Sequence, residues 1–114
     1  MTLETFKAKL KASPEAIEFT ETMAVVEDNY NFKPTAFKNG ALHNESGQNS
    51  GSCKVFAFAI EQGLTKEETL ACFGKYYYSD VLQNPNATDH QNIRNFMKSG
   101  FEGLALEAVA LQKR

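Results

Sequence analysis

The chain contains no tryptophan, two histidines, two cysteines and three prolines, and it has no run of Lys or Arg longer than Lys113-Arg114. With only two histidines, and no metal-ligand spacing around them, we expect neither a metal site nor a cofactor. Cys53 and Cys72 lie in separate apolar segments without the paired spacing of a zinc ribbon, so we expect two reduced, buried thiols. Nucleic-acid binding is disfavoured, because releasing counterions from a phosphate backbone requires clustered Lys and Arg.

Long apolar runs are also missing. The longest, Val55 to Ile60, is far shorter than the roughly 20 residues that span a bilayer, and the N-terminus lacks the basic-then-apolar pattern of a signal peptide. We therefore expect a soluble protein that is made in the cytoplasm of the producing cell, with no membrane span. A length of 114 residues with 42% hydrophobic and 23% charged side chains fits one globular domain over residues 1–114.

Apolar spacing and Gly or Pro punctuation predict helices over most of the chain. Thr2 to Ala12 is amphipathic, and a second helix is predicted from Pro14 to Asn29, where Ser13 caps the start and Pro occupies the first turn. Cys53 to Gln62 is apolar on all sides, with Ser50 or Ser52 as its cap and Gly63 as its stop. This segment is predicted to be the buried central helix, although a buried strand stays open as an alternative.

Two capping boxes predict the helices that follow. Thr65 and Glu68 begin a fourth helix that Gly74 can split, and Thr88 with Gln91 begins a fifth that continues through Ser99. The tail from Leu104 to Arg114 fits helix or strand. Within Tyr76-Tyr77-Tyr78, Tyr77 lies on the core stripe, so Tyr76 or Tyr78 is free to line the mouth of a pocket.

Pro34 to Ser52 is the one long polar segment. A loop of this length inside a small domain is usually functional or disordered. Asn39-Gly40 is a candidate hairpin turn, with Ala36-Phe37 and Ala41-Leu42 as short strand arms. The predicted fold is therefore mainly α, with five to six short helices around a buried central helix, one long ordered polar loop and room for a small hairpin.

Several strings in these segments occur together in one known family. They are Asn39-Gly40, the run from Asn44 to Lys54 (NESGQNSGSCK), Thr69 to Gly74, Tyr77-Tyr78 with Asp80 to Leu82, and Asp89 to Phe96 (DHQNIRNF). The set resembles the HopJ type III effector family from about Phe19 to Leu104. The resemblance implies a bacterial protein that a type III system can export into a host cell, but it implies no reaction. The chain departs from the family at Tyr78, where Arg is usual, and at Phe101, where Trp is usual, which argues against a strict chemical role for either position.

The polar loop leads into the N-terminus of the predicted central helix, where glycines, small hydroxyls and free amides attract a phosphate or carboxylate. It is not a Walker A loop, because its glycine and lysine spacing is wrong. We expect the loop and the segment from Asp89 to Arg94 to converge on one polar pocket that binds a protein partner or a small anionic ligand. The candidate ligand-binding residues are Asn44, Asn49, Ser50, Ser52, Asp89, Asn92 and Arg94.

Two other functional interpretations stay open. In a small hydrolase or transferase, Glu45 and His90 would transfer protons, with Asp89 orienting the histidine, and the amides of Ser50 to Cys53 would stabilise an anion. Cys53 would be a nucleophile only if the helix N-terminus lowered its pKa. Alternatively, the same polar side chains merely satisfy the backbone and brace the loop. The oligomeric state and the identity of any partner do not follow from the sequence.

Overall fold

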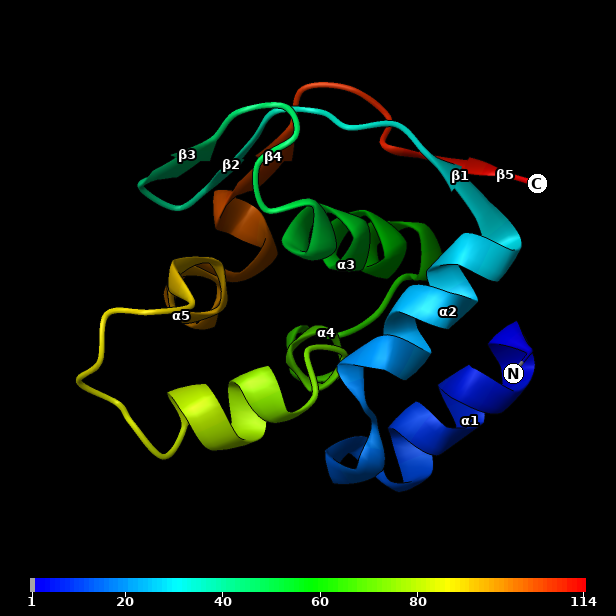
Figure 1. Ribbon diagram of the computed structural model, residues 1–114, viewed down its shortest axis with the longest axis horizontal. Coiled ribbons are helices and arrows are strands. Elements are labelled where there is room, and N and C mark those ends of the chain that lie inside the picture. The colour runs from blue at the N-terminus through cyan, green and yellow to red at the C-terminus, as the bar shows by residue number, and fades with distance from the viewer. Residues whose placement is uncertain (1) are drawn as a thin grey trace.

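The computed structural model describes residues 2–114, and it is mainly helical with small antiparallel sheets. The α-helices are α1 (Leu3–Ala12), α2 (Phe19–Asn29), α3 (Ser50–Gln62), α4 (Lys66–Ala71) and α5 (Gln91–Ser99). Short 3₁₀ segments, η1 (Pro14–Ala16) and η3 (Gly100–Gly103), and one π-helix, η2 (Tyr76–Val81), complete the helical part. In Figure 1, α3 lies in the middle, with α2 and α1 on one side and α5 on the other.

The central helix forms as predicted. Cys53, Val55, Phe56 and Phe58 are at most 1% exposed, which excludes the strand alternative and places the core around α3. Two details of the prediction are wrong. The helix begins at Ser50 rather than Cys53, and Ile60 is 52% exposed, so the last turn is not buried on all sides.

The predicted second helix is broken near its start. Only Pro14–Ala16 is helical, as a 3₁₀ turn, and Ser13 makes no side-chain cap. Ile17 and Glu18 are extended before α2 begins at Phe19. The extended backbone turns the Ile17 side chain into the core, where it is 2% exposed, so tertiary burial overrides local helix propensity here.

Most of the predicted long loop is structured. The hairpin is present, with β2 (Phe37–Asn39) antiparallel to β3 (Leu42–Asn44), and Gly40 at φ +62° in the turn. The arms are therefore one to two residues later than predicted. The tail is strand rather than helix: β4 (Leu104–Leu106) pairs with β2, and β5 (Leu111–Lys113) pairs with β1 (Tyr30–Phe32) beside the C-terminus (Figure 1).

The fourth helix is split at Gly74, as its position indicates. Gly74 has φ +62°, and a Cβ there would lie 2.8 Å from the backbone nitrogen of Phe19. The Thr65 capping box is confirmed, because Thr65 Oγ1 accepts the Glu68 N–H at 3.1 Å and Glu68 Oε1 accepts the Thr65 N–H at 2.9 Å. The second predicted box is wrong: the Gln91 amide donates to the Thr88 carbonyl at 2.6 Å, and His90, not Thr88, occupies the N-cap position of α5, without a side-chain hydrogen bond to the first turn.

Within residues 2–114, every helix is too short or too polar to cross a lipid bilayer.

Candidate functional site

A pocket of about 410 Å³ lies between the first turns of α3 and α5. Gly51 and Ser52 line it from α3, and Gln91 and Asn92 line it from α5. The two polar segments expected to converge therefore meet at one concave surface, with the start of a helix on each side.

Both helices begin at a residue in the left-handed conformation. Asn49 has φ 51° and ψ 47°, and His90 has φ 52° and ψ 46°. They are the two non-glycine residues with positive φ among residues 2–114. Such conformations cost on the order of 1 kcal/mol or more and persist only where the surroundings impose them. Both strained residues border the pocket.

Neither of these residues caps its helix with its side chain. The prediction that Ser50 or Ser52 caps α3 is also wrong, because both serines lie inside the helix. By contrast, α1 and α4 each begin with a threonine side chain that accepts a first-turn N–H. The side chains of Asn49 and His90 turn instead to other partners.

The first turns of α3 and α5 consequently present free backbone donors. The first N–H with an acceptor in α3 is that of Cys53, which donates to the Asn49 carbonyl at 3.0 Å, and in α5 it is that of Arg94, which donates to the His90 carbonyl at 3.1 Å. The N–H groups of residues 50–52 and 91–93 have no acceptor within the described part of the chain. Each helix N-terminus also carries roughly half a positive charge from the aligned peptide dipoles.

An asparagine cluster holds the two helix starts in place. Asn44 and Asn92 exchange two amide hydrogen bonds, of 3.0 and 3.2 Å, and Asn49 Nδ2 donates to Asn44 Oδ1 at 2.6 Å. Asn39 Nδ2 donates to the Asn92 carbonyl at 2.7 Å. Asn44 is 1% exposed and does not border the pocket, so it serves as a brace, whereas Asn49 and Asn92 both line the pocket.

Aromatic rings form another wall of the pocket. Phe19 stacks on Phe73 with ring centroids 6.4 Å apart and meets Tyr76 edge to face at 5.2 Å. Tyr76 lies 5.3 Å from the imidazole of His90. Of the two tyrosines expected near a pocket mouth, Tyr76 lines this pocket and Tyr78 does not.

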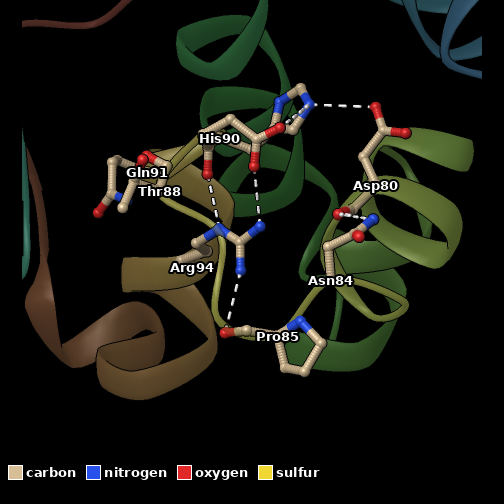
Figure 2. Close-up of polar contacts among 8 residues, drawn as sticks. Asp80, Asn84, Pro85, Thr88, His90, Gln91 and Arg94 are labelled. Atoms are coloured by element: carbon tan, nitrogen blue, oxygen red, sulfur yellow. Dashed lines mark hydrogen bonds and ion pairs between the residues drawn. The ribbon is translucent and has the colours of Figure 1, made fainter.

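His90 is oriented by a carboxylate that the sequence did not indicate. Its Nε2 lies 3.1 Å from Asp80 Oδ2 on η2, and 3.9 Å from Asp89 Oδ2 (Figure 2). Because a carboxylate only accepts hydrogen bonds, the short contact places a proton on Nε2. The expectation that Asp89 orients His90 is therefore corrected to Asp80.

Arg94 and Asp89 bind each other. The Arg94 guanidinium donates to Asp89 Oδ1 at 2.8 Å, to the Asp89 carbonyl at 2.6 Å and to the Pro85 carbonyl at 3.4 Å (Figure 2). The hydrogen bond from Arg94 is the main cause that lowers the pKa of Asp89. Neither residue borders the pocket between α3 and α5. The pair instead closes the loop before α5, so the structure does not bring these two candidate ligand residues to the site.

Glu45 lies apart from His90. Its carboxylate is 72% exposed and contacts His43 Nε2 at 3.2 Å, and no hydrogen bond or ion pair joins it to His90 within residues 2–114. Ser50 Oγ donates to the Gly47 carbonyl at 3.4 Å, and this serine does not line the pocket, whereas Ser52 does. The geometry thus gives no support to proton transfer between Glu45 and His90, whose catalytic roles stay predictions.

The cysteines are reduced and buried, as predicted. Burial raises the pKa of Cys53, and its Sγ lies 3.9 Å from the Thr35 carbonyl. Burial likewise raises the pKa of Cys72 to about 12. The nucleophile hypothesis for Cys53 required a lowered pKa and is therefore wrong.

Some residues of the site were missed by the sequence analysis. Phe19 and Phe73 sit at core-stripe positions, and their role at a pocket wall has no local signal. Gly51 could have been noticed as a close-approach glycine, because a Cβ there would lie 2.9 Å from Phe19 Cζ. Asp80 was named only within a family string, and nothing in the sequence linked it to the histidine ten residues away that it orients. Residues 2–114 hold no group of three or more His, Cys, Asp or Glu side chains arranged to bind a metal ion.

Comparison with known proteins places this chain in a family. A family model described as HopJ type III effector protein matches residues 3–111. The chain therefore belongs to the HopJ type III effector family, which confirms the resemblance. It is also similar to the crystal structure of VPA0580, a protein of unknown function, with 54% identity, a TM-score of 0.98, and coverage of 100% of this chain and 95% of that one. No curated protein matches.

Proposed function

We propose that this protein acts by binding a small anionic ligand, of the phosphate or carboxylate class, in the pocket between α3 and α5. The observation that carries the proposal is that two helices open the same pocket with unpaired first-turn N–H groups. A single helix N-terminus is common in proteins, but two that face one concave surface supply donors from opposite sides.

Electrostatics favour an anion over a cation. The pocket lining contains no Asp or Glu, while each helix dipole contributes about 0.3–1 kcal/mol toward a nearby anion and up to about 2 kcal/mol in partly buried geometry. His90 adds a polar ring whose orientation Asp80 fixes. A cation would meet no carboxylate in the lining and would lie against the positive ends of both dipoles.

The backbone strain at Asn49 and His90 fits the same function. A glycine at either position would relieve the strain, and a Ser or Asp with ordinary cap geometry would satisfy the free donors. Instead, the N-termini of α3 and α5 have no side-chain cap, and the Asn49 side chain donates a hydrogen bond to Asn44. This arrangement sacrifices local stability at the pocket, which is typical of binding sites.

A pair of aspartate substitutions tests the proposal. Ser52→Asp puts a carboxylate into the pocket lining, where it would occupy the anion position, and Ser50→Asp adds the same charge to the same helix turn away from the pocket. Both changes are favourable to the helix dipole, so neither should lower stability. We expect inorganic phosphate, titrated calorimetrically, to bind wild type and Ser50→Asp and to lose at least tenfold in affinity with Ser52→Asp. Equal binding to both variants, or none to wild type, would refute the proposal.

Family membership adds a biological setting to the proposal. The family is named for type III effectors, so we propose synthesis in the bacterial cytoplasm and export by a type III system, with the pocket working in the host cell. The binding activity itself does not depend on export. It is measurable with the purified chain.

A further inference from the structure

The pocket offers more than donors for an anion. Its volume of about 410 Å³ has room for on the order of ten water-sized groups, whereas an inorganic phosphate fills only a fraction of that space. Besides the two helix starts, Phe19, Phe73 and Tyr76 line it, together with Leu42 and Ile93. Apolar walls with a few converging polar groups are typical of sites for organic ligands.

Tyr76 is the unusual member of this wall. It is 41% exposed, although Phe19 and His90 pack against its ring at centroid distances of 5.2 and 5.3 Å. Its hydroxyl makes no hydrogen bond within residues 2–114, so polar bonding of that group does not explain its position. An aromatic ring therefore lines the pocket between two packing partners, yet is only partly covered by protein.

The backbone conformation near Tyr76 and Phe19 determines where their rings lie. Tyr76 begins the π-helix η2, a rare conformation that is frequent at functional sites. Gly74 allows the chain before η2 to approach the Phe19 backbone, and Gly51 lies against the Phe19 ring, where any Cβ would be 2.9 Å from Cζ. Phe19 thus contacts both the anion-facing turn of α3 and the ring of Tyr76.

We infer that the ligand is an aromatic anion, whose ring packs against Tyr76 and Phe19 while its phosphate or carboxylate lies between the starts of α3 and α5. This inference rests on the proposed function for its anionic half. Its aromatic half rests on the rings that line the pocket. Tyr76 is accordingly the specificity-determining residue, because an aromatic contact contributes roughly 0.5–1.5 kcal/mol beyond area burial, a factor of about twofold to tenfold in affinity.

Three phosphate probes separate the two halves of the site. Inorganic phosphate reports the anion position alone, cyclohexyl phosphate adds an apolar ring, and phenyl phosphate adds an aromatic ring of similar size. We expect phenyl phosphate to bind at least tenfold more tightly than inorganic phosphate and about twofold to tenfold more tightly than cyclohexyl phosphate. Competition measured by NMR line shifts places all three probes at the same site.

Two variants at Tyr76 complete the test. Tyr76→Phe keeps the ring and should keep the preference for phenyl phosphate over cyclohexyl phosphate, whereas Tyr76→Leu removes the ring and should abolish that preference, measured as the ratio of the two affinities within each variant. Equal affinity of wild type for the three probes, or an unchanged preference in Tyr76→Leu, would overturn the aromatic inference and leave the anion site standing. No binding of any probe would overturn the proposed function, and the inference with it.

Discussion

Asn44 and Asn92 exchange a reciprocal pair of amide hydrogen bonds, Asn92 Nδ2 to Asn44 Oδ1 at 3.0 Å and Asn44 Nδ2 to Asn92 Oδ1 at 3.2 Å. The first residue ends β3 and the second lies in the first turn of α5. Because Asn49, which precedes α3, donates to the same Asn44 oxygen, one buried amide joins both helix starts. The spacing of the pocket walls is therefore fixed by hydrogen bonds rather than by apolar packing alone.

The amide pair should be coupled energetically. Asn44→Ala and Asn92→Ala each leave the partner's buried amide unsatisfied, so each should lower the free energy of unfolding by about 2 kcal/mol. The double variant should lose clearly less than the sum, because the second substitution removes a group that already lacks its partner. Urea denaturation measures all three, with exposed Glu45→Gln as a control expected within about 0.5 kcal/mol of wild type. Strict additivity would contradict the coupling.

A side chain at Gly74 should destabilise the protein by a steric clash as well as by backbone strain. Gly63 is the control, because a side chain there causes backbone strain alone. Both have positive φ, +62° and +63°, but a Cβ at Gly74 would lie 2.8 Å from the Phe19 nitrogen, while a Cβ at Gly63 meets nothing within 4 Å. Gly63→Ala should cost only the backbone strain, about 1 kcal/mol, and Gly74→Ala should cost about 2 kcal/mol more because rigid backbone must move. Thermal and urea unfolding of the pair measure the difference. Equal losses would show that Phe19 is not fixed where the structure places it.

Much of this fold follows from local patterns. The Thr65 capping box, the Gly63 stop and the apolar run of α3 are each set by neighbouring residues, and each is found in the structure. The predicted hairpin is found too, but its turn is Gly40-Ala41 rather than Asn39-Gly40, because Asn39 still pairs with Leu42. The features that the sequence did not predict depend on contacts with residues far away along the chain. The tail becomes strand only because β2 and β1 present free edges, and Ile17 leaves helical geometry to reach the core.

In the candidate site, too, some features follow from the local sequence and others depend on distant contacts. The meeting of the Asn49 and Ser52 segment with the start of α5 was predictable from the polar character of both. The role of Arg94 was not, because its preference for Asp89 and a loop carbonyl depends on the path of residues 85–89. The open, left-handed helix starts at Asn49 and His90 contradict what capping rules predict, and such exceptions tend to occur at functional positions.

The free energy of unfolding should fall at acid pH, because two carboxylates that are hydrogen-bonded in the folded state become protonated. The hydrogen bond from Lys9 holds the pKa of Glu21 below its usual value, and the N–H of Thr65 is the main cause that lowers the pKa of Glu68. A carboxyl group whose pKa is lower in the folded than in the unfolded state stabilises the fold. This contribution is complete above the group's pKa in the unfolded state, near 4.5, and it is lost as the pH falls through the group's pKa in the folded state. Urea midpoints should therefore fall below about pH 4.5. Glu21→Gln should show a smaller fall than wild type; an identical pH dependence would contradict the Lys9 pairing.

Both thiols should be unreactive in the native protein. Burial raises the pKa of Cys53 and brings that of Cys72 to about 12, so almost no thiolate exists at neutral pH. Labelling with iodoacetamide should be slow in buffer and rapid in denaturing urea. Cys72→Ser isolates the reactivity of Cys53. Fast labelling of that variant under native conditions would contradict the burial of Cys53 and revive its candidacy as a nucleophile.

We propose above that the starts of α3 and α5 form one anion site. Amide NMR during a titration with inorganic phosphate tests it most directly, because it reports each backbone N–H separately. We expect the signals of Gly51 and Ser52 in α3 and of Gln91 and Asn92 in α5 to shift together, along a single saturation curve with one Kd, while that of Gly63 stays unchanged. Shifts confined to one helix, or no saturable shift in either, would contradict it.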